Sequence, residues 1–481
     1  MKPRPPARLA VFAFAVALAL GGCVVGPRYA PPITPTTAKT PFVSAQSANA
    51  VDAPLPPRWW RLYNDPILDR LVEQALVENE DLKVAAANLA YAQGLLEEAR
   101  AGRFPTTSLT GGVAYGVSAQ PGAVNAPTLG YSATFAASYD FDLFGRIRRA
   151  IQSAKANAES VLAAEDAVRV TVAAETAGAY ANICGYARQI AVARASLTLV
   201  QETYDITLTE RNAGALSDFD LAREAVLLEQ AKAAIPPLEG QRRSALFTLA
   251  ALIGKTPAEV PADAATCQAP PTLIKPLPVG DGAALLRRRP DLRQAERALA
   301  AATARIGVAA ADLYPTVTLG GSVNPTGTLS GPGAGASLLS YSIGPLITWT
   351  FPNILVARAH VKEASAQASA ALATFDGAVL TALEETEQAL ATYAAELDHH
   401  VALAAARERA NEAVRLEKVQ SQAGVASFLD LLQVQATAVA ADQALAASDQ
   451  AVSADQVAVF QALGGGWEDA PAVVPPPIPK R

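Results

Sequence analysis

Residues 131–141 read Tyr-Ser-Ala-Thr-Phe-Ala-Ala-Ser-Tyr-Asp-Phe, a stretch in which the character of the side chains alternates. The odd positions include Tyr131, Phe135, Tyr139 and Phe141, whereas the even positions hold Ser, Thr, Ala and Asp. Because successive side chains of a strand point to opposite faces, this pattern predicts a β-strand with one apolar face. Eleven residues of about 3.3 Å each, tilted by about 45°, cross roughly 25 Å, which is the height of the apolar band of an outer-membrane barrel.

Three further stretches of the chain alternate in the same way. One such hairpin alone would favour a β-sandwich with one solvated face, and this alternative stays open. Four strands cannot close a barrel, however, and lipid does not tolerate an open sheet edge. If the strands face lipid, several chains must contribute them to one barrel. The apolar side chains of the three stretches are Leu109, Val113, Tyr115 and Val117, then Val317, Leu319 and Val323, and then Leu339, Tyr341, Ile343, Trp349 and Phe351.

A tandem repeat runs through most of the chain. Pro315 follows Pro105 by 210 residues, and Gly464 follows Gly254 by the same 210 residues. No gap is needed to align residues 81–254 with 291–464. Agreement at one constant offset over this length indicates a duplication.

Each copy of the repeat predicts the same order of elements. A helical segment comes first, the strand hairpin second, a very long helix third and a returning helix last. The long helix of 66 residues would measure roughly 100 Å. The predicted helical segments are 65–103 and 281–312, the long helices 146–211 and 356–421, and the returning helices 217–253 and 427–463.

The N-terminus predicts export and a lipid anchor. Three basic residues precede an apolar stretch over residues 9–20, which indicates a signal peptide over 1–22. The stretch ends Leu-Gly-Gly-Cys and resembles the bacterial lipoprotein box, in which Cys23 would become the first mature residue and carry acyl chains such as palmitate. An ordinary export signal is the alternative. Val24 is not the Asp that lipoprotein sorting associates with retention in the inner membrane.

Composition shifts divide the mature chain into five parts. Residues 23–64 are rich in Pro, Ala and Thr and predict an extended, lipidated strap. The repeats occupy 65–254 and 281–464, and a Pro-rich linker over 255–280 joins them. The tail over 465–481 predicts a disordered segment.

Composition also excludes several classes of protein. The chain has 481 residues, 51% of them hydrophobic and 17% charged, and a net charge of −6, which argues against a nucleic-acid binder. Three His and three Cys leave little material for a metal site, and none is predicted. Beyond residue 22 no run of about 18 uncharged apolar residues occurs, so helical membrane spans are not expected.

Several short motifs occur together in this chain. They are the start Cys23-Val-Val-Gly-Pro-Arg-Tyr-Ala-Pro, the pair Trp59-Trp60, the segment Arg289-Pro290-Asp291-Leu292 with Ala295-Glu296, the pairs Ile306-Gly307 and Tyr314-Pro315, and the duplicated Ala-Gly…Ser…Asp-Leu turns. Together they resemble the outer-membrane factor family of TolC-like efflux channels, and specifically its lipoprotein branch, the NodT type. The resemblance implies an α+β membrane protein: a homotrimer with a twelve-stranded outer-membrane β-barrel and a twelve-helix periplasmic α-barrel, with a collar near the middle that is built partly from the linker and the C-terminal region.

The resemblance also implies a function without covalent chemistry. The protein would be no enzyme and would need no cofactor beyond the lipid on Cys23. It would act in the outer membrane as a passive, gated conduit for drugs or other toxic small molecules. Its partners would be a periplasmic adaptor (membrane fusion) protein and an inner-membrane pump of the resistance-nodulation-division type. A lipid-anchored coiled-coil scaffold, and an exit duct for exported proteins or metal ions, are the alternatives.

The same resemblance assigns site residues to the two helix turns at the periplasmic end. Asp430 matches a lumen-facing carboxylate, three copies of which would form a cation-attracting gate. A second family carboxylate falls on Gln433, so we expect a less charged ring, and Asp220 is the first-repeat equivalent of Asp430. Both Asp side chains could instead be ordinary first-turn residues, whose negative charge the helix dipole favours. Residues expected to dock the adaptor, which could also be plain helix caps, are Gly214, Ser217, Gly424, Val425 and Ser427.

The two remaining cysteines are placed by helix geometry. Cys184 lies about 30 residues from the first turn, or roughly 45 Å along the long helix. The returning helix ends near Gly254, roughly 55 Å from the turn, and Cys267 follows in the linker. Both cysteines are then expected at a similar height, near the middle of the molecule's long axis, and in an oxidising compartment. We hypothesise a disulfide between them, with two unpaired thiols as the alternative.

Overall fold

The computed structural model describes residues 24–46, 48–117, 126–273, 275–352, 354–422 and 428–477. The chain divides into two compact units. One comprises Met1–Pro32, Leu89–Val161 and Gln294–Phe375, and the other Ile33–Asn88, Leu162–Arg293 and Asp376–Arg481. We call them the strand unit and the helix unit.

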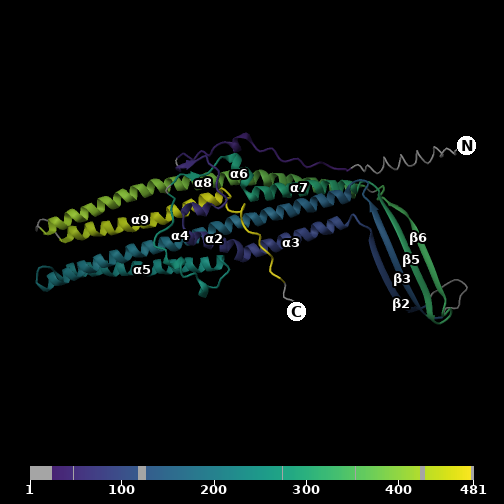
Figure 1. Cartoon of the computed structure of the whole chain (residues 1–481), viewed down its shortest axis with the longest axis horizontal. Helices are drawn as coiled ribbons and strands as arrows, with labels where there is room; N and C mark the ends of the chain where they lie inside the picture. Colours follow the sequence, from purple (N-terminus) through teal and green to yellow (C-terminus); the bar gives the residue numbers. More distant parts are fainter. Residues whose placement is uncertain are drawn as a thin grey trace. The chain divides into compact units, whose positions relative to one another are not determined.

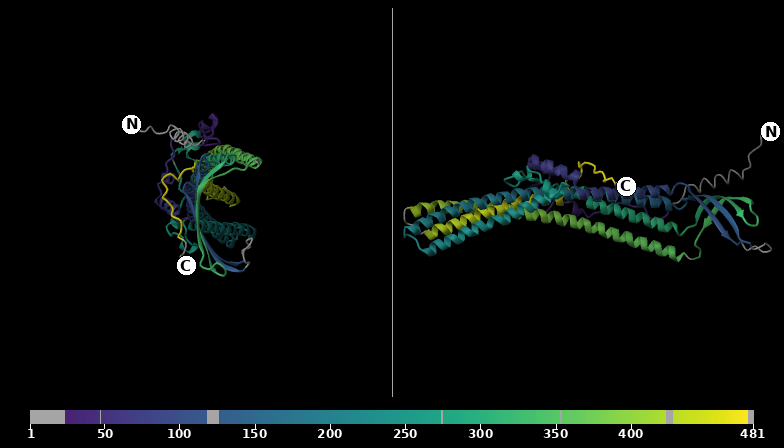
Figure 2. Two further views of the ribbon diagram at one scale, coloured as in Figure 1. Left: turned by 90° about the vertical axis from the view of Figure 1, so that its right-hand side faces the viewer. Right: turned by 90° about the horizontal axis from the view of Figure 1, so that it is seen from below.

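The strand unit contains one antiparallel sheet, in the order β2-β3-β5-β6 (Figure 1). The first repeat supplies β2 and β3 and the second supplies β5 and β6, and β3 pairs with β5 across the repeats. Figure 2 shows the four strands as one curved sheet. The predicted strand over 131–141 is confirmed as part of β3. The bounds are Thr106–Gly116 for β2, Thr128–Phe141 for β3, Thr316–Ser330 for β5 and Ser337–Thr348 for β6.

The helices follow the predicted order in both copies. The long helices α4 (Arg146–Asn212) and α8 (Leu355–Gln422) have residues in both units and begin and end within about one residue of the prediction. The returning helices are α5 (Asp218–Leu252) and α9 (Phe428–Ala462). The helical segment before each hairpin is split in two, into α2 (Pro66–Glu78) and α3 (Glu80–Ala101), and into α6 (Gly282–Arg288) and α7 (Pro290–Ala311).

The sequence explains where these helices begin and end. The carboxylate of Asp65 accepts hydrogen bonds from the first amides of α2, and Pro66 fits the first turn because it has no amide to satisfy. Gly254 and Gly464 follow the returning helices, both with φ of +68°. A Cβ at Gly254 would lie 2.4 Å from the carbonyl oxygen of Glu78, so only glycine allows this approach.

The strap and linker hold short elements in the helix unit. The strap forms η1 (Thr36–Lys39), β1 (Ala50–Val51) and η2 (Trp59–Tyr63). The linker forms η3 (Pro257–Glu259), η4 (Ala264–Thr266) and β4 (Leu277–Pro278). Strand β1 pairs in parallel with β4, so the strap and the linker are joined by backbone hydrogen bonds.

The tail differs from its prediction at its start. Gly465 packs so closely on Leu55 and Trp59 that a Cβ there would lie 2.4 Å from a Leu55 methyl group. The guanidinium of Arg293 lies 4.5 Å from the ring centre of Trp467. The prediction of a disordered tail from residue 465 is therefore wrong for residues 465–467. The composition of the segment gave no sign of the aromatic surface on which it packs.

Within the described ranges, no helix combines the length and apolar character that a membrane crossing requires.

Candidate functional site

The sheet has one apolar face and one face of small polar residues. Directly paired residues in neighbouring antiparallel strands point to the same face. The register therefore places Leu109, Phe135, Val323 and Tyr341 in one row across all four strands. The next row, on the opposite face, consists of Ser108, Ala136, Ser322 and Ser342. The alternation seen in the sequence thus becomes two chemically different surfaces.

The apolar face is exposed in the single chain. Leu109 is 78% exposed, and Tyr341 and Ile343 are each 79% exposed. A β-sandwich would need a second sheet to cover this face. The other sheet among the described residues pairs only β1 with β4, two residues each, which is too small to cover strands of 11 to 15 residues. The apolar face is therefore suited to lipid.

The two edge strands of this sheet are β2 and β6. Each presents a row of backbone amides and carbonyls that no described strand pairs. In hydrocarbon such groups have no water to bind, so both edges must pair with further strands before the sheet can enter a membrane.

Helix α4 ends and helix α5 begins at the first helix turn, and both ends are capped by hydrogen bonds. Gly214 has φ of +77°, and the amide of Ala215 donates to the carbonyl of Glu210 at 2.9 Å, which closes the end of α4. Ser217 caps α5: its hydroxyl accepts a hydrogen bond from the amide of Asp220 at 3.2 Å. The carboxylate of Asp220 in turn accepts hydrogen bonds from the amide and the hydroxyl of Ser217, at 3.1 and 2.6 Å.

Asp220 therefore has a structural partner at the turn. Its hydrogen bonds with Ser217 hold the pKa of the Asp220 carboxyl below its usual value. These contacts place Asp220 in the first turn of α5, where a carboxylate also favours the helix dipole.

The second turn lies partly outside the described residues. Gly424, Val425 and Ser427 fall outside them, as does Cys23 at the N-terminus. Asp430 and Gln433 are described, and both side chains are exposed on the first turns of α9.

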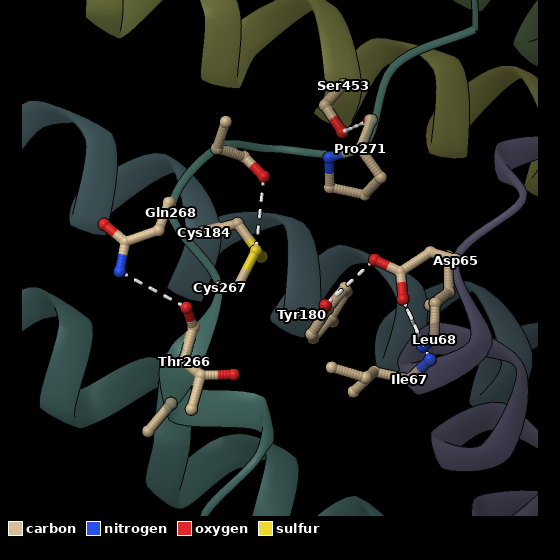
Figure 3. The surroundings of a disulfide bond; sticks show 12 residues. Asp65, Ile67, Leu68, Tyr180, Cys184, Thr266, Cys267, Gln268, Pro271 and Ser453 are labelled. Atoms are coloured by element: carbon tan, nitrogen blue, oxygen red, sulfur yellow. Dashed lines mark hydrogen bonds between the residues drawn. A yellow bond between two sulfur atoms is a disulfide. The ribbon is translucent and has the colours of Figure 1, made fainter.

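A disulfide joins Cys184 of α4 to Cys267 of the linker, with an S–S distance of 2.05 Å (Figure 3). Close by, the hydroxyl of Tyr180 donates to Asp65 at 2.9 Å, and the hydroxyl of Ser453 on α9 donates to the carbonyl of Pro271 at 2.6 Å. The linker is thus tied to both a long and a returning helix within the helix unit.

One group of contacts, in the strand unit, was not predicted from sequence. The guanidinium of Arg149 donates to the carbonyls of Val25 and Gly26, at 3.1 and 3.0 Å. The hydroxyl of Tyr29 donates to Glu296 at 2.7 Å. Tyr29 and Glu296 belong to two motifs of the family resemblance, and these contacts explain why the motifs occur together: they fasten the strap to α4 and α7.

A buried carboxyl on α5, Glu224, was also missed. The equivalent position 210 residues later is Val434. A comparison of the repeats position by position would have shown a charged residue where its counterpart is apolar. Among the described residues, no group of three His, Cys, Asp or Glu side chains could hold a metal ion.

Comparison with known proteins gives consistent results over nearly the whole chain. A family model described as outer membrane efflux protein matches residues 71–255 and 283–465. Nodulation protein T of Rhizobium leguminosarum bv. trifolii is 32% identical over 421 residues, which cover 87% of this chain and 89% of that protein. Outer membrane protein OprJ of Pseudomonas aeruginosa is 30% identical over 98% of both chains.

A solved structure of the outer-membrane channel OprN is also similar to this chain. It superimposes with a TM-score of 0.85 at 34% sequence identity, over 92% of this chain and all of that one.

Proposed function

This chain belongs to the outer membrane efflux protein family, and we propose that it is the outer-membrane channel subunit of a three-part efflux system. In this role it is a passive conduit that carries small molecules from an inner-membrane pump across the periplasm and the outer membrane. The family is one of transport proteins, and the proposed work requires no covalent chemistry and no cofactor.

One observation supports this function above the others: a four-stranded sheet with an exposed apolar face and two edges that no other described strand pairs. Three copies would supply twelve strands, an even number that can close around a lumen. The face of small polar residues, with Ser108 and Ser322, would then line the lumen. A lipid-anchored scaffold would need neither the apolar rows nor the unpaired edges.

The two helix turns are the proposed periplasmic end of the conduit. The turn with Gly214 and Ser217, and its second-repeat counterpart with Gly424, Val425 and Ser427, would contact a periplasmic adaptor protein. Three copies of Asp430 around the axis would form a ring that attracts cations and restricts passage, and Gln433 would leave that ring less charged. Asp220, held by Ser217, would support the turn.

The proposed anchor is Cys23, acylated after removal of residues 1–22. The Arg149 hydrogen bonds to Val25 and Gly26 support it, because they hold the first residues after the anchor against α4. Acyl chains contribute about 0.8 kcal/mol per buried methylene, so a multiply acylated Cys23 would stay in the membrane.

Single-channel recording tests the proposal. The purified full-length protein is added to planar bilayers, and we expect cation-selective conductance whose selectivity falls at high salt, since salt screens exposed charges. Asp430→Ala should enlarge the conducting events. The matched control is Asp218→Ala at the other turn, where the carboxylate pairs with Arg211 at 2.6 Å, and it should leave conductance nearly unchanged.

A protein that never conducts would favour the scaffold. Identical conductance in wild type and Asp430→Ala would reject the proposed gate at Asp430, but it would still support the channel function.

A further inference from the structure

Glu224 is a buried carboxyl for which the described residues provide no hydrogen-bond donor to Oε2. It lies in the second turn of α5, it is 1% exposed, and its Oε2 atom accepts no hydrogen bond from any described residue. Burial raises the pKa of Glu224, and no neighbouring charge offsets that effect. An unsatisfied buried acceptor of this kind destabilises the folded state, so its presence calls for an explanation.

Glu224 lines a cavity of about 260 Å³ between α4, α5 and α9, within the helix unit. Apolar side chains form much of its wall, among them Val200 of α4, Leu227 of α5, and Leu432 and Val439 of α9. Gln230, Gln435 and Gln443 also line it. The cavity therefore combines one acidic group, several amides and an apolar wall.

Among the described residues that line this cavity, Glu224 is the one ionisable group. From α4 the cavity is lined by Ala193, Ser196 and Val200, and from α9 by neutral residues. The rest of α5 that faces it is neutral as well. A cationic ligand would therefore supply the countercharge that no described side chain of the wall gives to the carboxylate.

We propose that this cavity binds a small organic cation, a primary ammonium on a short alkyl or aryl group. The ammonium would donate to the carboxylate of Glu224 and to the amide oxygen of a neighbouring Gln, and the hydrocarbon would lie against Leu227 and Val439. At roughly 30 Å³ per water, the cavity has room for a ligand of about nine non-hydrogen atoms. A divalent metal is not favoured, because it needs several carboxylate or carbonyl oxygens where this wall offers one carboxylate.

The ligand would act as a bridge between three helices. It would join α5 to α4 and α9 behind the first turn, and so stabilise the arrangement of the helix unit described above. The second repeat has Val434 in place of Glu224, so the site occurs once in each chain. It is distinct from the proposed gate at Asp430, and its test does not depend on transport.

The experiment uses the purified full-length protein in detergent, with benzylammonium as the probe and benzyl alcohol as its neutral counterpart. A ligand that binds the folded state alone raises the unfolding temperature in proportion to its occupancy. We expect a saturable rise with benzylammonium and none with benzyl alcohol. The rise should be larger at pH 8 than at pH 5, because the ammonium must displace a proton from a carboxyl whose pKa is raised.

Two variants and one control locate the site. Glu224→Gln should weaken benzylammonium binding at least about tenfold, because loss of one partner of a buried charge pair costs more than 1.4 kcal/mol. Val439→Phe keeps the carboxyl but fills the cavity, and should also abolish the rise. Glu229→Gln, on an exposed carboxylate that pairs with Lys232 at 2.8 Å on the same helix, should bind as wild type does.

The absence of a saturable rise in the wild-type protein would overturn the proposal. An equal response to benzyl alcohol, or an undiminished response in both Glu224→Gln and Val439→Phe, would do the same.

Discussion

The two repeats share a backbone plan but differ in the side chains that complete it. In the first repeat the amide of Asn79 donates to the carbonyl of Leu252, at the end of α5, at 3.0 Å. In the second the guanidinium of Arg289 donates to the carbonyl of Ala462, at the end of α9, at 2.8 Å. Both donors and both acceptors are 210 residues apart. The same orphan carbonyl is satisfied twice, by different chemistry.

The difference shows that the helix end requires a hydrogen-bond donor at a fixed position but does not require a particular side chain. The last turn of a returning helix needs a donor, because its carbonyls have no partner within the helix. Asn79 meets that need and also caps α3, since its Oδ1 accepts from the amides of Asp81 and Leu82. Arg289 meets it and also pairs with Asp291 and Glu385, at 2.6 and 2.7 Å. Both copies of the repeat therefore supply a donor to the carbonyl near the end of the returning helix, but they supply it with different side chains.

The largest expected effect is a loss of stability when Phe460, near the end of the returning helix α9, is replaced. Phe460 is fully buried and stacks on Trp59 with ring centres 4.7 Å apart, whereas its first-repeat equivalent is Ala250. Phe460→Ala should destabilise the protein by about 3–5 kcal/mol, since it removes a buried ring and leaves a cavity. Ala250→Gly, the matched change in the first repeat, should cost only about 1 kcal/mol. Thermal unfolding measures both changes in stability. Equal losses of stability in the two variants would show that the stacking of Phe460 on Trp59 does not distinguish the repeats.

A second prediction concerns the disulfide, which joins the first repeat to the linker. The position in the second repeat that is equivalent to Cys184 is Ala394, so the second repeat has no cysteine there. The double variant Cys184→Ala/Cys267→Ala should lose about 2–4 kcal/mol, because the bond closes a long loop across a sequence separation of 83. A reductant should lower the unfolding temperature of wild type and leave the variant unchanged. Labelling of both cysteines by a thiol reagent in unreduced, denatured protein would reject the bond.

The smallest expected effect concerns the caps of the turns. Ser217→Ala should destabilise the start of α5 by about 1 kcal/mol, the usual cost of losing a serine cap. Because the folded pKa of Asp220 is lowered, its stabilisation is present above the ordinary Asp value of about 3.9 and is lost as the pH falls below that value through the folded pKa.

Hydrogen exchange of the first amides of α5 measures both effects. Asp220→Asn should remove the acid dependence, and Asp218→Asn should leave it in place, because the pair of Asp218 with Arg211 is exposed. Unaltered acid dependence in Asp220→Asn would mean that another group titrates there.

Much of the fold could be predicted because it is local. The long helix predicted over 146–211 is α4, Arg146–Asn212, and the alternation at 131–141 is part of β3. The start of the tail could not be predicted, because Gly465 packs on Leu55, 410 residues earlier in the chain. The Arg149 contact with Gly26 was missed for the same reason, since 123 residues separate the partners.

The sequence by itself determined the duplication, the two periodicities and the apolar face of the strands. Each follows from how side chains repeat along one helix or one strand, so neighbouring residues suffice to show it. Only the tertiary structure decided which polar groups are satisfied. It left Oε2 of the buried Glu224 without a hydrogen bond from any described residue, and it packed the start of the tail on Trp59. Burial and pairing depend on segments that are distant along the chain, and no local pattern encodes them.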